Sequence, residues 1–230
     1  MSFRVRLSAL IVASALVLVG CGGSDDGGGE GVADLSAAKI LAAAKKQLAQ
    51  EEFITIEGKG VDEDAGTEIE VHLAFAGETA EGTVSVSGME LELLRADGKA
   101  YFKADKKFFE SSGAPAETMD LIGDKWVVID PSNASFAQIG SFVEKDGFFK
   151  ELLKPDGKVT KGKEKSVNGV DCVALKSKQG TFYFDKSDGK PVSLVSTDDG
   201  EGTLDFSYDE IDEAQAPPSD EVLDPAQLGS

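Results

Sequence analysis

From about residue 53 onward, apolar and polar residues alternate along most of the chain. Residues 69–75, for example, place Ile, Val, Leu and Phe at every second position, with Glu, His and Ala between them. Successive side chains of a β-strand point to opposite faces, so this period of two predicts strands with one apolar and one polar face. The runs with this pattern are residues 54–57, 68–75, 83–87, 89–93, 100–103, 107–110, 126–129, 159–165, 170–175, 180–185, 192–197 and 203–208.

Other segments repeat their apolar residues at the spacing of an α-helix. The first of them follows Asp34 and Ser36, either of which is a candidate N-cap. A later pair of helices is expected to be interrupted near Gly147, and each member carries an apolar stripe. The helical segments are residues 35–50, 115–122, 135–143 and 146–153.

These elements predict an α+β fold. Short Asx-Gly turns separate the strands in meander order, and the right-handed twist of so many strands forces the sheet to curl. We expect a strongly curved antiparallel half-barrel of about 11–12 strands, with the helices covering its concave face. The space between can hold a ligand. Candidate lining residues are Leu73, Phe75, Val84, Val86, Leu91 and Leu93 on the strands, and Phe136, Ile139, Phe142, Phe148 and Phe149 on the helical insertion.

The N-terminal region follows neither pattern. Two arginines precede an apolar run that is too short to span a bilayer core of ~30 Å, and this predicts a cleaved export signal over residues 1–20. Residues 21–33 are Gly-rich and acidic, which predicts a flexible tether. Residues 34–230 are long enough to form one domain with its own core.

The signal ends in Leu-Val-Gly-Cys at residues 18–21, which resembles the lipobox of bacterial lipoproteins. That resemblance implies that Cys21 is acylated, becomes the first residue of the mature chain and anchors it to the cell membrane on the extracytoplasmic side. An ordinary secretory signal that happens to contain a cysteine is the alternative. A multiply acylated cysteine gives firm membrane attachment, because each buried methylene adds about 0.8 kcal/mol of affinity.

The chain carries a formal net charge of −19, which argues against nucleic acid as a partner and against a body lying flat on anionic headgroups. The one basic block is the lysine-rich run at residues 158–165. It alternates like an exposed edge strand, where lysines discourage pairing with other sheets. A rim that contacts lipid headgroups is the alternative interpretation.

The sequence offers few reactive groups. The single histidine, His72, falls on the polar side of its strand, and Cys172 lies in an apolar strand as a small buried hydrophobe. If Cys21 is acylated, no disulfide and no His/Cys metal site can form. Residues 62–66 and 198–201 are candidates for calcium, but acidic hairpin turns explain them. Nucleophile-elbow and phosphate-loop motifs do not occur, so we expect a protein that is not an enzyme and has no cofactor.

Several segments of the mature chain resemble the LppX/LprG group of actinobacterial lipoproteins, which is similar in fold to the lipoprotein carriers LolA and LolB. The resemblance implies an open half-barrel with a helical lid over an apolar cavity, used to carry or present lipids at the outer face of the plasma membrane or across the envelope. The segments that carry it are Cys21, residues 22–33, the helix 35–50 followed by 53–58, the strands 99–104 and 125–130, and the ending 206–208 with 216–224.

Three functions therefore compete at this point. The first is a membrane-anchored carrier of a lipid or acylated ligand. The second is a non-enzymatic envelope scaffold or sensor, whose acidic surface docks another envelope protein or a transporter. The third is a hydrolase whose site the motifs do not reveal. The 13 Phe residues against one Trp suit contact with acyl chains and a filled core equally well.

Overall fold

The structure is a computed structural model that describes residues 31–62, 66–111, 116–155, 157–178, 180–196 and 202–225. The predicted signal, Cys21 and the candidate calcium segment 198–201 lie outside the described residues. The body already includes Val32, whose side chain is 7% exposed and packs in the core.

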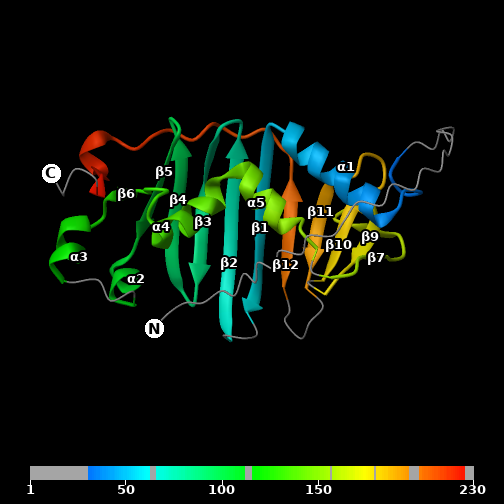
Figure 1. The fold of residues 1–230 in the computed structure, drawn as a ribbon, viewed down its shortest axis with the longest axis horizontal. Helices are drawn as coiled ribbons and strands as arrows, with labels where there is room; N and C mark the ends of the chain where they lie inside the picture. Colours follow the sequence, from blue (N-terminus) through cyan, green and yellow to red (C-terminus); the bar gives the residue numbers. More distant parts are fainter. Residues whose placement is uncertain are drawn as a thin grey trace, which may run out of the picture.

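The body is built on one sheet of thirteen described strands, which extends along the longest axis of the molecule (Figure 1). The strand order is β13-β6-β5-β4-β3-β2-β1-β12-β11-β10-β9-β7, and β8 also pairs with β9. The strands are β1 (Phe53–Asp62), β2 (Thr67–Ala76), β3 (Thr79–Val86), β4 (Met89–Ala96), β5 (Lys99–Ala104), β6 (Trp126–Val128), β7 (Thr160–Lys161), β8 (Lys165–Val167), β9 (Val170–Lys176), β10 (Thr181–Asp185), β11 (Pro191–Val195), β12 (Thr203–Ser207) and β13 (Val222–Leu223).

Helices α1 (Ala37–Gln50), α4 (Ala134–Gly140) and α5 (Lys145–Leu152) lie over one face of this sheet (Figure 1). This arrangement confirms the predicted α+β class, an antiparallel sheet with helices over one face; only β13 pairs in parallel, with β6. The described helices are α1 (Ala37–Gln50), α2 (Lys106–Ser111), α3 (Ala116–Ile122), α4 (Ala134–Gly140), η1 (Ser141–Val143), α5 (Lys145–Leu152) and η2 (Ser219–Glu221).

The turn pattern predicted one continuous meander, but the sheet contains two. Strands β1 to β6 form a first meander and β9 to β12 a second, and the two join where β12 pairs with β1. Alternation within a strand says nothing about this long-range pairing. The short β13 was also missed, because two residues show no period.

Three local predictions need correction. Residues 107–110 were expected as a strand but belong to α2, where the Asp105 carboxylate accepts a hydrogen bond of 2.9 Å from the Phe108 amide and caps the helix. The break between the central helices falls at Glu144, and Gly147 lies inside α5. The lysine-rich run at 158–165 contributes two short strands rather than one, and β7 is the edge strand that its pattern predicted.

The main core lies between the sheet and the helices. Helix α1 begins after its N-cap Ser36 and buries Ile40, Ala44 and Leu48 against the sheet. Helix α5 places Phe149 beside Phe75 of β2, with ring centres 5.3 Å apart. The C-terminal segment crosses the other face of the sheet, where a small second cluster forms around Leu94, Tyr101 and Ala214.

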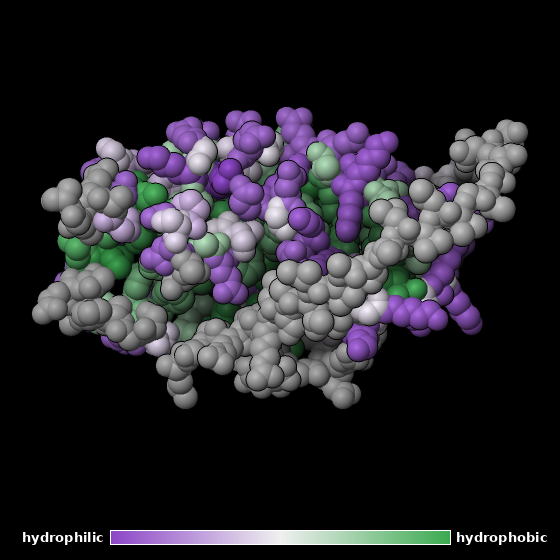
Figure 2. All heavy atoms as spheres, in the orientation of Figure 1, coloured by the Kyte–Doolittle hydropathy of each residue, from purple (hydrophilic) through white to green (hydrophobic). Residues whose placement is uncertain are grey.

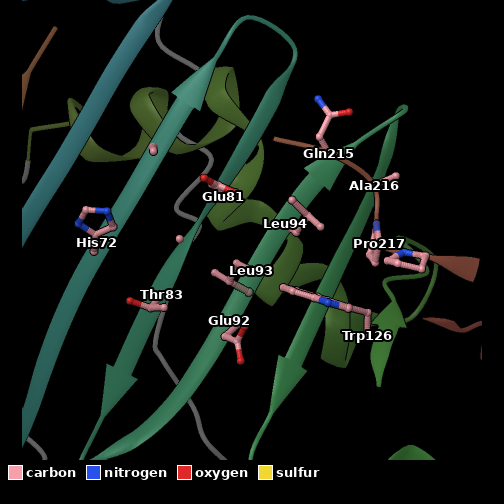
Figure 3. A pocket seen from close by; sticks show the side chains of 13 residues that line it. His72, Glu81, Thr83, Glu92, Leu93, Leu94, Trp126, Gln215, Ala216 and Pro217 are labelled. Atoms are coloured by element: carbon pink, nitrogen blue, oxygen red, sulfur yellow. The ribbon is translucent and has the colours of Figure 1, made fainter. Parts of the chain in front are cut away.

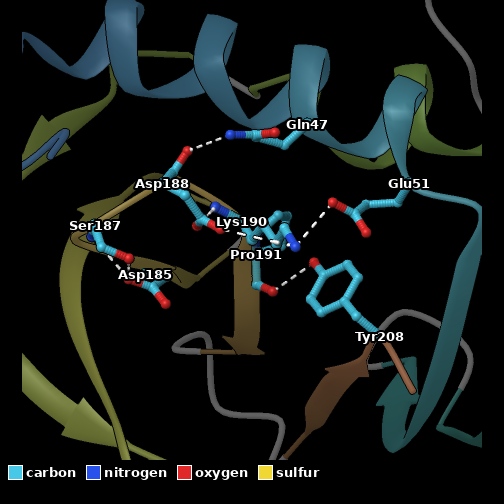
Figure 4. A network of polar contacts seen from close by, with 8 residues as sticks. All are labelled: Gln47, Glu51, Asp185, Ser187, Asp188, Lys190, Pro191 and Tyr208. Atoms are coloured by element: carbon cyan, nitrogen blue, oxygen red, sulfur yellow. Dashed lines mark hydrogen bonds and ion pairs between the residues drawn. The ribbon is translucent and has the colours of Figure 1, made fainter. Parts of the chain in front are cut away.

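A polar network fastens the C-terminal end of α1 to the second meander (Figure 4). The Lys190 ammonium lies 2.8 Å from the Glu51 carboxylate, 3.8 Å from Asp188 and 5.0 Å from the centre of the Tyr208 ring. Tyr208 donates a hydrogen bond of 2.7 Å to the Pro191 carbonyl, and burial raises the pKa of its hydroxyl. The hydrogen bond to Glu51 raises the pKa of Lys190.

We expect Lys190→Met to lower the free energy of unfolding by about 1 kcal/mol near neutral pH, because it removes a charged hydrogen bond that is mostly shielded from water. A raised pKa means that the contribution is complete below the unfolded lysine pKa of about 10.4 and disappears as the pH rises through the folded value. The free energies of unfolding of the unaltered protein and of Lys190→Met, measured with urea, should therefore converge in strong alkali. Lys106→Met is the control, since the Lys106 side chain is 70% exposed. An equal loss in both variants would contradict this role.

Candidate functional site: an apolar groove at the open end of the sheet

The covering helices are narrower than the strands are long. Helices α4, α5 and α1 run across the strands and leave the lower ends of the strands in Figure 1 uncovered. A ten-residue strand such as β2 is about 33 Å long, whereas a helix with its side chains is about 10–12 Å wide. One layer of helices therefore covers only part of each strand, and the rest of the apolar face needs another partner.

The burial of side chains along the strands follows this geometry. On the helix-facing side of β2, Leu73 and Phe75 are fully buried, whereas Ile69 and Val71 are only partly buried. Figure 2 shows hydrophobic side chains at the surface below the helices, beside a hydrophilic rim. The neighbouring strands repeat the gradient, with the buried and partly buried pairs Val84 and Val86 in β3, and Leu93 and Leu91 in β4.

A groove of about 350 Å³ lies over the strand ends that the helices leave uncovered, which we call the open end of the sheet. The register makes its walls continuous, since Gly58 of β1 is paired with Val71 on one side and with Leu204 on the other, and Leu204 is paired with Leu194. The exposed Val61 lies at its margin, with 45% of its surface accessible. The lining residues are Gly58, Lys59, Gly60, Val61, Ile69, Val71, Leu194, Ser196, Gly202, Thr203 and Leu204.

Two glycines explain why the groove is hollow. The helix-facing positions of β1 are Ile54, Ile56, Gly58 and Gly60, so two large side chains are followed by two positions without any. A Cβ at Gly58 would lie 2.1 Å from the Thr203 carbonyl oxygen, which excludes every other residue there. At Gly60 a Cβ would make an ordinary van der Waals contact of 3.5 Å with the Gly202 Cα, so this position accepts a side chain.

The structure gathers the predicted cavity residues on one face. Five of them are at most 5% exposed and form core rather than an open wall: Leu73, Phe75, Val84, Leu93 and Phe149. The Phe148 ring centre lies 5.8 Å from that of Phe75 and 6.4 Å from that of Phe142, and Phe136 stacks on Phe102 at 5.3 Å. The remaining candidates, Val86, Leu91 and Ile139, are partly buried against the same core.

A ligand-binding role for these residues stays a prediction. The sequence interpretation missed the glycines and Leu194 and Leu204 of the groove, although one signal for them exists. Gly58 and Gly60 fall in phase with the apolar positions of β1, and a glycine inside a strand often marks a close approach of backbone or ligand.

The opposite face of the sheet is acidic. It carries His72 on its surface, as predicted, and the imidazole Nδ1 lies 2.9 Å from the Glu57 carboxylate. A wide hollow of about 520 Å³ lies between this face and the C-terminal segment, beside Trp126 and Pro217 (Figure 3). Its walls mix carboxylates with apolar groups, so it suits a polar or cationic partner better than an acyl chain.

The thiol of Cys172 is buried. Cys172 is 1% exposed in β9, and burial raises the pKa of its thiol, so it stays protonated and unreactive. The described part of the chain contains no group of three or more His, Cys, Asp or Glu side chains placed to hold a metal ion. Within the same residues, no helix combines the length and apolar character needed to cross a membrane.

Comparisons with known proteins found distant structural likenesses only. LprF from Mycobacterium bovis is 13% identical, with a TM-score of 0.48 over 77% of this chain and 95% of that one. MucB is also 13% identical, with a TM-score of 0.35 over 80% of this chain and 61% of that one. A DUF1329 family protein from Desulfovibrio piger has 13% identity, a TM-score of 0.24 and coverage of 75% and 91%. No family model and no curated protein matches the chain. At these values the likenesses assign no activity or ligand.

The change from buried core to partly buried strand end can be measured with two identical residues on one strand. We expect Leu93→Ala to lower the free energy of unfolding by about 2–5 kcal/mol, because Leu93 is 1% exposed and its removal leaves a cavity. Leu91→Ala, two residues away on the same face, should cost less than half as much. Urea denaturation of both variants provides the measurement, and equal losses would show that the open end is packed like the core.

Proposed function

We propose that this chain is an extracytoplasmic lipoprotein, anchored to the cell membrane through Cys21, that binds a lipid or acylated ligand and carries or presents it. The groove on the helix-facing side of the sheet carries this proposal. Its helix-facing walls are apolar, it is continuous with the partly buried ends of β2 to β4, and it opens to solvent. Such a surface gains free energy by covering an apolar ligand.

The size of the groove limits what it holds. A volume of about 350 Å³ is near the lower end of the range of roughly 300–1,000 Å³ that is typical of small-molecule sites. We infer that it takes one acyl chain at a time, with the polar head of the ligand left in water at the rim.

Carrying rather than chemistry fits the composition of the groove. Among the described residues that line the groove, none is a carboxylate, histidine or cysteine, and His72 projects from the opposite face of the sheet. General acid–base catalysis needs a titratable side chain within hydrogen-bond reach of the ligand. We therefore propose a binding protein that is not an enzyme and needs no cofactor.

A second candidate is the docking of an envelope protein or transporter on the acidic face. It is favoured by the carboxylates of Glu57, Glu70, Glu90 and Asp205, which surround a shallow hollow on that face. The two functions are compatible, since they use opposite sides of the sheet. Substitutions in the groove should impair only lipid binding, and substitutions on the acidic face should impair only protein docking.

The anchor can be tested by changing one atom. Cys21→Ser removes the sulfur that would be acylated, so we expect the variant to leave the membrane fraction, either as precursor or as secreted protein. Carbonate-washed membranes probed for the protein provide the measurement. Ser24→Ala, three residues further on, is the control and should behave like the unaltered protein. If Cys21→Ser stays with the membranes, the chain is held there in some other way.

The groove can be filled without disturbing the core. We expect Gly60→Leu to reduce the uptake of a fluorescent fatty acid at least tenfold while changing the free energy of unfolding by less than about 1 kcal/mol, since a Cβ there makes only an ordinary van der Waals contact. Lys59→Leu adds a similar side chain that points to the other face, and it should retain uptake. Unchanged binding by Gly60→Leu would place the ligand elsewhere, and lost binding by both variants would mean that the effect is not local.

A further inference from the structure

The lysines of this acidic protein are concentrated at one end of it. Residues 158–178 contain six lysines and two acidic residues, Glu164 and Asp171, in a chain whose net charge is −19. All six lysines are exposed: Lys158, Lys161, Lys163, Lys165, Lys176 and Lys178. They belong to β7, β8, β9 and the turns around them, at the end of the sheet farthest from β6 and β13 (Figure 1). We call this surface the lysine end.

The chain enters the folded body at the same end. The Val32 amide donates a hydrogen bond of 2.8 Å to the Lys186 carbonyl, directly after β10. The Lys161 ammonium donates to the carbonyls of Ala33 and Leu35. The first described residue, Gly31, packs against the backbone of Lys186 so closely that a Cβ there would lie 2.3 Å from its carbonyl oxygen. This entry point is therefore fixed to the lysine end by backbone contacts.

The distance from the anchor to the entry point is short. Nine residues lie between Cys21 and Gly31, so the ten chain steps from one to the other span at most about 35 Å when fully extended. Gly-rich sequences of this length have an average reach of about 16–19 Å. Anchoring through Cys21, which is part of the proposed function, thus holds the lysine end within this distance of the lipid headgroups.

We propose that the lysine end is a docking surface for anionic membrane lipids, on which the body stands with its long axis pointing away from the bilayer. Lysines close to a membrane are attracted by anionic headgroups, and the effect fades within a Debye length of about 10 Å at 0.1 M salt. The acidic face of the sheet is repelled by the same headgroups. The two effects favour one orientation and keep the groove along the side of the standing body, clear of the headgroups.

The orientation can be measured with the full acylated chain in vesicles. A donor fluorophore is placed at Ser166→Cys in β8, or at Ser111→Cys in α2 near the other end; both positions are exposed, and the buried Cys172 escapes labelling. Energy transfer to acceptor lipids is compared in phosphatidylcholine vesicles with and without phosphatidylglycerol. In anionic vesicles we expect at least about twofold more transfer from position 166 than from position 111, and a smaller ratio in 1 M salt.

Matched charge changes test the lysines themselves. Replacing Lys158, Lys163, Lys165 and Lys178 by Gln should reduce the difference between the two labels in anionic vesicles to the one measured in phosphatidylcholine vesicles. The control replaces four exposed lysines elsewhere, Lys99, Lys106, Lys107 and Lys150, and should preserve it. Equal transfer from both labels on vesicle-bound protein, or a difference that the first set of changes leaves as large as in the unaltered protein, would overturn the docking surface alone. Protein that does not sediment with vesicles would overturn the anchor and the docking surface together, while uptake of fatty acid by the groove tests the lipid-binding proposal separately.

Discussion

The structure depends on the cover that a single layer of helices gives to one apolar face of long strands. Hydrophobic burial fixes the fold where α1 and α5 lie, because the side chains between these helices and the sheet are buried. The strands extend beyond the helices, and their apolar residues continue with them. The apolar face is therefore covered along one part of each strand and uncovered along the rest. This incompleteness is what a binding site for an apolar ligand requires.

The two faces of the sheet and its two lateral ends differ in the residues that they carry. The helix-facing side supplies the core and the groove, and the other side carries the acidic residues. Along the sheet, the lysines and the entry of the chain share one end. The proposed anchor, the proposed membrane-facing end and the groove form a consistent arrangement, which would hold the groove near the bilayer without pressing it against the headgroups. A charge of one sign spread evenly over the surface would give no such orientation.

Much of this architecture could be predicted from the sequence, and the reasons for the rest are physical. Alternation placed Leu73 and Phe75 on the face that the helices cover, and it identified the edge strand near Lys161. Residues 107–110 misled because Lys-Phe-Phe-Glu fits a helix as well as a strand, and the Asp105 cap decided between them. Periodicity also cannot say where along a strand a helix will pack. For that reason the candidates included residues that turned out to be core, and the groove at Gly58 and Gly60 was missed.

The most direct test of the account is to find where an acyl chain lies on the folded protein. A fatty acid with a photoactivatable group at its tail, bound to the full chain and irradiated, forms adducts that peptide mass mapping can place. The account predicts adducts in β1 near Gly60, in β2 near Val71 and in β12 near Leu204, and their loss in Gly60→Leu. Adducts on the acidic face beside Trp126, or a pattern that Gly60→Leu leaves unchanged, would contradict it.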